Sequence, residues 1–204
     1  MTINKQSFII PHMRTKDESK IEALHQAVID VINHDGYQNL SVAKIAKKAG
    51  VSVATLYIYY SDKKDMLGKV YLKIKDLIDA KLFNEFDPQG PFEQQFKRLL
   101  RNYADAICTY PEKAAVMRVF NSNPNLVAED VYSQSMDLGK PVADLYRHGL
   151  EEKLIRQYEP EIFISFTFNA IDSLAQIRFM QGKTLTKDEV DQLIEMAWAA
   201  CKQN

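Results

Sequence analysis

Lysines and hydroxyl-bearing side chains gather between residues 41 and 64, in a spacing that suits contact with a polyanion. The segment holds five lysines and one aspartate, so it carries a local charge of +4 in a chain whose net charge is −1. Ammonium groups pair with phosphate oxygens, and the hydroxyls of Ser, Thr and Tyr donate hydrogen bonds to them. The rest of the chain carries −5, which repels nucleic acid. This segment is therefore the candidate contact with a phosphate backbone.

Two short helices joined by a tight turn are predicted to position these side chains. Ser41 can cap the first helix by accepting a hydrogen bond from a free backbone amide, and Ile45 and Ala46 lie on its apolar stripe. Gly50 stands where a helix most readily ends in a left-handed residue, and Ser52 can cap the second helix. The order helix, glycine turn, helix indicates a helix-turn-helix.

The second of these helices has two different faces. Val53, Leu56 and Tyr60 cluster on one side when residues are placed about 100° apart around the axis. The opposite side and its flanks carry Ala54, Thr55, Tyr57 and Ile58. This outer face is the candidate face for reading DNA.

The segment resembles the DNA-binding domain of the tetracycline-repressor (TetR) family. The resemblance rests on Gly50-Val-Ser52, Thr55-Leu-Tyr57, Tyr60 and Lys63 in that order, and it covers about residues 15–70. It implies three parts: a flexible arm over 1–14, a helix-turn-helix domain over 15–66, and a ligand-binding and dimerisation domain over 67–204. In the arm, Arg14 and its neighbour Lys16 either reach a minor groove or belong to a solvated tail.

By the same resemblance, individual residues receive roles at the DNA. The family's phosphate and base-edge contacts fall here on Thr55, Tyr57, Tyr59 and Lys63. Its usual base-reading places hold Ala43, Val53 and Ala54, which depart from the polar residues of many relatives. Apolar groups touch thymine methyls but cannot bond guanine, so an operator rich in A·T pairs, read partly through its shape, is predicted. The candidate DNA-contacting residues are Ser41, Val42, Ala43, Lys44, Ser52, Val53, Ala54, Thr55, Tyr57, Ile58, Tyr59 and Lys63.

The fold class expected from composition and periodicity is all-α, with about nine helices. The 204 residues include seven glycines and seven prolines, and 46% are hydrophobic, which leaves little material for sheet turns but enough for a core. A helix over 126–152 is expected to kink at Gly139-Lys-Pro141. Pro160 is expected to begin a helix that runs to Gly182, and Thr186 to cap the last one.

The last two predicted helices carry heavy apolar faces. Burial within their own domain explains one stripe of each, whereas the resembled family packs the final helix pair against its copy as a four-helix bundle. A homodimer would hold two DNA-reading domains about 34–36 Å apart, the spacing of successive major grooves. The candidate interface residues are Phe163, Leu174, Ile177, Leu193, Ile194, Ala197, Trp198 and Cys201.

Aromatic and sulfur side chains on the middle helices indicate a ligand cavity, although core packing explains any one of them alone. The resemblance implies that a small hydrophobic effector binds there and lowers affinity for a (pseudo)palindromic double-stranded operator, as expected of a repressor. The candidate pocket residues are Tyr103, Met117, Phe120, Tyr132, Met136, Phe166, Asn169 and Ser173.

Two other function classes compete with a DNA-binding regulator: a helical metalloenzyme and a helical adaptor. A helical metalloenzyme needs a second Glu-x-x-His pair besides Glu22-x-x-His25, and the sequence has none, so no catalytic, metal or cofactor residues are assigned. A helical adaptor would use the motif for protein contact only. Cys108 and Cys201 lack metal or redox spacing, and no apolar run reaches about 18 residues. A cytoplasmic, nucleoid-associated protein without a membrane partner is expected.

Overall fold

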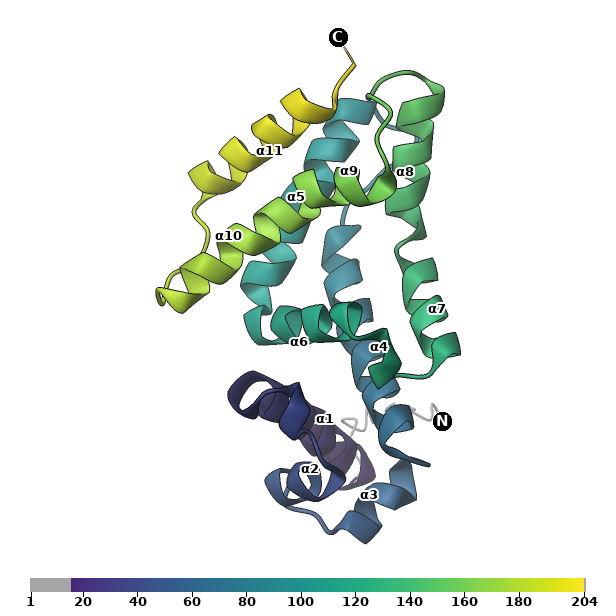
Figure 1. Cartoon of the computed structure of the whole chain (residues 1–204), viewed down its shortest axis with the longest axis vertical. Helices are drawn as coiled ribbons and strands as arrows, with labels where there is room; N and C mark the ends of the chain where they lie inside the picture. Colours follow the sequence, from purple (N-terminus) through teal and green to yellow (C-terminus); the bar gives the residue numbers. More distant parts are fainter. Residues whose placement is uncertain (1–15, 204) are drawn as a thin grey trace, which may run out of the picture. The chain divides into compact units, whose positions relative to one another are not determined.

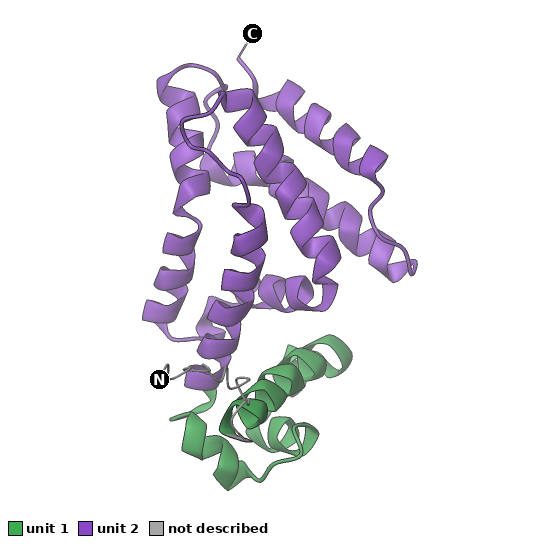
Figure 2. Cartoon of the chain, turned by 180° about the vertical axis from the view of Figure 1, so that it is seen from behind, with its two compact units in different colours: residues 1–63 green, residues 64–204 purple. Residues whose placement is uncertain are grey.

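The structure is a computed structural model that describes residues 16–203 and divides the chain into two compact units (Figure 2), unit 1 over 1–63 and unit 2 over 64–204. The described part holds eleven α-helices and two short 3-10 helices, without a strand. The predicted all-α class is confirmed. The expected arm with Arg14, and the side chain of Lys16, lie outside the described residues. No helix in the described range combines the length and apolarity that a bilayer crossing requires.

The described part of unit 1 contains three α-helices (Figure 1): α1 (Lys16–Asp35), α2 (Val42–Lys48) and α3 (Val53–Tyr59). The buried side chains of α1 recur at helical spacing, and Ile45 of α2 and Leu56 of α3 are fully buried as well. His25, whose sequence context suggested a metal pair, is buried, with its ring centroid 6.2 Å from that of Tyr60. It belongs to the packed interior of this unit.

The turn between α2 and α3 forms as its sequence predicts. The Ser41 and Ser52 hydroxyls accept hydrogen bonds from the backbone amides of Lys44 and Thr55, at 3.3 and 3.0 Å. Gly50 adopts φ +70°, a conformation that strains residues with a side chain. The Val51 amide then donates to the Ala46 carbonyl at 3.0 Å and closes the end of α2.

Unit 2 contains eight helices, of which the first begins at Lys63, the last residue of unit 1. They are α4 (Lys63–Leu82), α5 (Phe92–Thr109), α6 (Pro111–Ser122), α7 (Glu129–Leu138), α8 (Lys140–Glu151), α9 (Pro160–Phe166), α10 (Phe168–Met180) and α11 (Lys187–Cys201).

Two of the nine expected helices are each divided in two. Gly139 separates α7 from α8, because Pro141 has no N–H to continue the ladder and its ring clashes with the preceding turn. Thr167 separates α9 from α10 at ψ −89°, and its buried hydroxyl donates to the Phe163 carbonyl at 2.7 Å. A hydroxyl that bonds the backbone in this way competes with the helical ladder.

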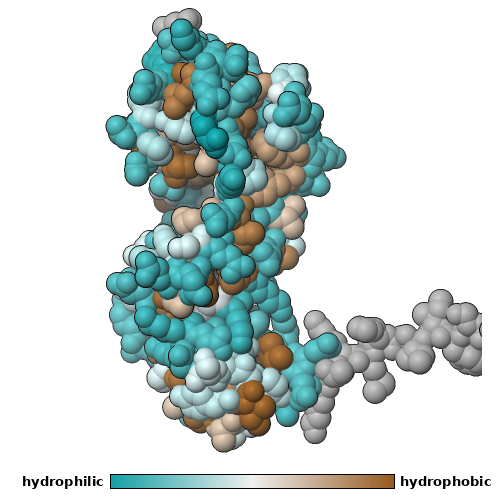
Figure 3. Space-filling model, turned by 90° about the vertical axis from the view of Figure 1, so that its right-hand side faces the viewer, coloured by the Kyte–Doolittle hydropathy of each residue, from teal (hydrophilic) through white to brown (hydrophobic). Residues whose placement is uncertain are grey.

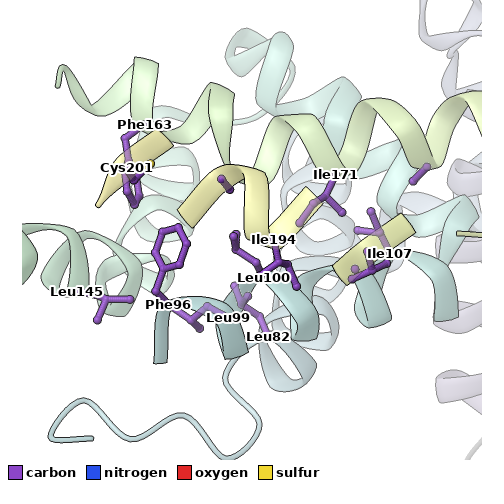
Figure 4. Close-up of a cluster of buried hydrophobic side chains, with 14 of the residues drawn as sticks. Leu82, Phe96, Leu99, Leu100, Ile107, Leu145, Phe163, Ile171, Ile194 and Cys201 are labelled. Carbon is purple, nitrogen blue, oxygen red and sulfur yellow. The ribbon is translucent and has the colours of Figure 1, made fainter. Parts of the chain in front are cut away.

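The core of unit 2 surrounds α5, which contacts α6, α8, α10 and α11. Figure 4 shows side chains of α5 such as Phe96 and Leu100 gathered with Ile171 and Ile194 from the two long C-terminal helices. Four residues expected at a dimer interface are buried in this core and present no surface to a partner: Phe163, Ile194, Ala197 and Cys201. Their placement corrects that part of the interface prediction.

One ion pair joins α10 to α11. Arg178 donates from Nε and Nη2 to Glu189 Oε1 at 2.7 and 2.5 Å, while Glu189 also completes a capping box with Thr186. The Arg178 guanidinium, followed by the Thr186 backbone amide, lowers the pKa of Glu189 to about 2. The charged carboxylate is therefore the form that stabilises this helix pair.

We expect Glu189→Gln to remove part of the pH dependence of folding. Because the folded pKa lies below the ordinary value of 4.5, this stabilisation is present above pH 4.5 and is lost as the pH falls towards 2. The variant should unfold at a lower temperature than the parent at neutral pH, and the difference should shrink in acid. Thermal unfolding of the two proteins, followed by circular dichroism at neutral pH and in acid, measures this difference in unfolding temperature. A difference that is the same at both pH values would contradict the stabilising role of the Glu189 carboxylate.

Candidate nucleic-acid interface

The outward face of α3 exposes apolar and aromatic side chains. Tyr57 is 51% and Ile58 76% exposed, whereas Leu56 and Tyr60 on the opposite face are buried. Val53, expected to face inward with them, is 40% exposed because it is the first residue of the helix, before the turn that packs. Figure 3 shows hydrophobic patches among the hydrophilic side chains of this unit. A helix face of this kind can contact base edges and methyl groups.

Lys63 lies at the base of the motif. Its ammonium donates to the carbonyl of Leu40, the residue before the cap Ser41, and so ties the start of α4 to the start of α2. An ammonium has three donors, so this bond leaves capacity for a phosphate oxygen. The structure thus places the Lys63 ammonium beside the residue that precedes Ser41, although Lys63 and Leu40 are far apart in sequence.

Tyr59 is held by an acidic residue of α1. Its hydroxyl donates to Asp17 Oδ1 at 2.9 Å, and this hydrogen bond raises the pKa of Tyr59. The donor expected to meet a phosphate is therefore already engaged, and a negative charge lies beside it. Asp17 was not singled out in the sequence, because only folding brings the start of α1 to the end of α3.

The concentrated positive charge of residues 41–64 is partly neutralised in the folded unit. Lys44 lies 3.1 Å from Asp35 and Lys48 3.6 Å from Asp30, and both carboxylates come from α1. These pairs are exposed and weak, so phosphates can compete for the lysines. The local charge of +4 nevertheless overstates the field at this surface.

The remaining candidate DNA contacts differ in what they can offer. The Ser52 and Thr55 hydroxyls bond each other at 2.9 Å, which leaves them less free for DNA than the sequence suggested. Ala43 and Ala54 are exposed, and Val42 is half-buried. All twelve candidate residues lie in unit 1, on α2, α3 and the residues that flank them.

Unit 2 contains a cavity of about 420 Å³, which residues from each of the helices α4 to α10 line. Four of the predicted pocket residues line it: Tyr103, Met117, Met136 and Asn169. The complete lining is Lys75, Ile78, Asp79, Leu82, Tyr103, Met117, Asn121, Ser135, Met136, Gly139, Val142, Ala143, Tyr146, Pro160, Phe163, Ile164, Phe168 and Asn169.

Four predicted pocket residues do not line this cavity. Phe120 is fully buried, with its ring centroid 5.0 Å from that of Tyr71, and the Tyr132 side chain is also outside the lining. Phe166 is 63% exposed and is the last residue of α9, the helix that ends at the break at Thr167. Ser173 is exposed on α10.

Sequence reasoning missed the residues that α4 contributes to the cavity. Lys75, Ile78, Asp79 and Leu82 recur at i, i+3, i+4 and i+7, which places two charged residues on an apolar stripe. That pattern was the available signal. Phe163, assigned to the dimer interface, also belongs to this lining.

Models of known protein families match residues in both units of this chain. The model of the bacterial regulatory proteins of the tetR family matches residues 26–70. A tetracyclin repressor-like C-terminal domain model matches residues 91–202, more than half of the chain. The chain belongs to the TetR family. It is a DNA-binding transcriptional regulator with a helix-turn-helix and a helical C-terminal domain.

Relatives match this TetR-family chain along almost its whole length. An uncharacterized HTH-type transcriptional regulator of Haemophilus influenzae is 23% identical over 94% of this chain and 100% of its own. The crystal structure of a TetR family regulator from Marinobacter aquaeolei has a TM-score of 0.81 at 25% identity, covering 94% of this chain and 100% of that one. FadR from Bacillus subtilis, solved in complex with stearoyl-CoA, has a TM-score of 0.66 at 18% identity, covering 88% and 98%.

We expect Asp17→Ala to strengthen DNA binding by about two- to fivefold, the effect of one exposed charge. The change releases the Tyr59 hydroxyl and removes a carboxylate from the motif. Fluorescence anisotropy with a random duplex at fixed salt measures the affinity. Glu18→Ala removes the same charge from the same helical turn and serves as the control. If the two variants bind the duplex with equal affinity, then release of the Tyr59 hydroxyl does not contribute to DNA binding.

Proposed function

We propose that this regulator is a homodimeric repressor that binds a pseudo-palindromic, A·T-rich operator and is released by a small hydrophobic ligand. The observation that carries the proposal is the exposed outer face of α3, where Ile58 and Tyr57 present apolar surface to solvent. Such exposure is unfavourable in isolation and suits a helix that enters a major groove lined with thymine methyls. Lys63 and the half-neutralised lysines supply the sequence-independent phosphate contacts.

The surface of the last three helices supports a dimer. Ile162, Phe166 and Ile177 are each about half exposed or more, and Met180 and Met196 are more exposed still. They extend along α9, α10 and α11, next to the half-buried Leu174, Leu193 and Trp198 of the predicted interface. Apolar side chains left exposed to solvent on three consecutive helices suit an interface between subunits.

The cavity of unit 2 supports regulation by a ligand. At about 420 Å³ it falls in the range of sites for small organic molecules, and its walls are mostly apolar. Helix α4 contributes to its wall and begins at the last residue of unit 1, so a ligand that displaces α4 acts on the segment that continues into the DNA-binding motif. Release follows when the ligand prefers a form in which the two motifs miss successive grooves.

The operator prediction is tested by selecting bound duplexes from a random pool. We expect A·T-rich half-sites whose centres are about 34–36 Å apart, one turn of the duplex. Selection of sites with G·C pairs at the half-site centres would contradict the proposed reading by apolar groups. Loss of binding at raised salt would separate this regulator from an adaptor that does not bind DNA.

A second test isolates Ile58. Replacing thymine by uracil in the selected site removes one methyl group per base and should weaken binding by about fourfold at a contacted position. In the Ile58→Ala variant the same replacement should have no effect, because the side chain that met the methyl is gone. Equal sensitivity of the two proteins to uracil would remove Ile58 from the reading face.

The dimer is tested with Phe166→Glu, which places a charge on an apolar side chain that is 63% exposed. We expect this variant to shift to the monomer mass in light scattering and to lose operator affinity with a folded circular dichroism spectrum. Leu154→Glu makes the same change at an exposed apolar residue outside α9, α10 and α11, and should leave the mass unchanged. A monomeric parent protein at micromolar concentration would contradict the proposal.

A further inference from the structure

The cavity of unit 2 contains one charged pair. Of the eighteen described residues that line it, Lys75 and Asp79 are the two charged ones. Lys75 Nζ donates to both oxygens of Asp79, at 2.9 and 2.7 Å, and the two side chains are only 12% and 10% exposed. Withdrawing an ion pair from water among apolar side chains is costly, so the presence of this pair needs a physical explanation.

Folding stability does not supply that reason. Lys75 and Asp79 are one turn apart on α4, so their pair holds no second element in place. The other well-enclosed pairs of unit 2 do, because Arg118 on α6 meets Asp172 on α10 at 2.7 Å, and Arg178 joins α10 to α11. A pair within one helix adds little even when it is fully formed.

Burial acts against the pair as well. The pKa of Asp79 is raised, burial being the largest cause, although Lys75 lowers it. Desolvation of this carboxylate therefore outweighs the attraction of its partner. Replacing such a pair by apolar residues of similar volume is often neutral or stabilising. The pair therefore does not serve folding stability, and a role in ligand binding explains its presence.

We propose that Lys75 is the anchor for the head group of the effector, and that the effector is an amphiphile with an apolar tail and one carboxylate. This inference rests on the proposed ligand-released repressor. Asp79 holds the ammonium in the free protein, and a ligand carboxylate offers the same two-oxygen geometry. The apolar walls formed by residues such as Ile78, Leu82 and Val142 receive the tail.

One lysine can serve two carboxylates. An ammonium has three donors, and Asp79 takes two of those of Lys75. The same arrangement already exists in unit 2, where Lys97 lies 2.8 Å from Glu93 and 2.7 Å from Glu195. A carboxylate that enters the cavity can therefore share Lys75 without leaving Asp79 unpaired.

The opposite assignment, a cationic head at Asp79, is disfavoured by the two side chains. Asp79 is short and buried, and Lys75 covers it with two hydrogen bonds, so a cation would have to displace Lys75 against like-charge repulsion. Lys75 has a long flexible stem that can follow a ligand head. A ligand with an uncharged hydroxyl head group would form only a weaker hydrogen bond with Lys75.

The test compares three probes with one tail, dodecanoate, dodecan-1-ol and dodecylammonium, by calorimetry below their critical micelle concentrations. For the parent protein, dodecanoate should bind at least about tenfold more tightly than either of the others, the effect of one charge-assisted hydrogen bond. Operator binding and its release by each probe are measured separately by anisotropy.

Variants of Lys75 and Asp79 test whether these two residues cause the preference for dodecanoate. K75M/D79L removes both charges and should abolish the preference for dodecanoate, keep operator binding without ligand, and unfold at the same or a higher temperature than the parent. K69M/D65L removes a surface pair of the same spacing on α4, 3.0 Å long, and should keep the preference. Asp79→Asn leaves Lys75 without its competing carboxylate and should tighten dodecanoate binding, which keeps the test open if the double variant does not fold.

The outcomes are distinguishable. Equal binding of the three probes, or an unchanged preference in K75M/D79L, would overturn the head-group assignment and leave the hydrophobic effector standing. Absence of binding by every probe would overturn both the assignment and the hydrophobic effector. Failure of the parent protein to bind operator in the absence of any probe would instead contradict the repressor proposal itself.

Discussion

Unit 1 depends on the burial of one face of a helix that cannot stand alone. Helix α3 has seven residues, and isolated helices shorter than about 12 residues are marginal in water. Its orientation therefore comes from burial of Leu56 and Tyr60, from the Ser52 cap and from the left-handed turn at Gly50. Those constraints leave Tyr57 and Ile58 on the outside, so the proposed DNA-reading face is a consequence of how the other face packs.

Features encoded by neighbouring residues could be predicted from the sequence. The caps at Ser41, Ser52 and Thr186 and the helix start at Pro160 each depend on a side chain within three or four residues, and each is present. Helical periodicity likewise gave the all-α class. The same locality explains why a kink was predicted at Gly139-Lys-Pro141, although one helix ends there and another begins.

Features that depend on distant residues could not be predicted in the same way. Asp17, Asp30 and Asp35 precede the basic segment in sequence, yet folding brings them to Tyr59, Lys48 and Lys44, so a charge count over 41–64 missed them. The break at Thr167 has no proline or glycine beside it, so the neighbouring residues gave no sign of it. The exposure of Phe166 and the burial of Ile194 in the core likewise depend on how the helices of unit 2 pack.

Two local rules of stability are broken at three places in this chain for which a partner is proposed. Ile58 exposes apolar surface on α3, and Phe166 does so on α9, whereas Lys75 and Asp79 enclose charge in an apolar cavity. Residues that lower stability without a compensating contact inside the protomer are expected at functional sites. The proposed compensating contacts are external: a thymine methyl for Ile58, a second protomer for Phe166 and a ligand head group for Lys75. Because α4 bears Lys75 and begins at Lys63, one helix spans both the ligand wall and the motif. In the proposed regulation, a ligand that displaces α4 therefore acts on the helix that continues from the motif.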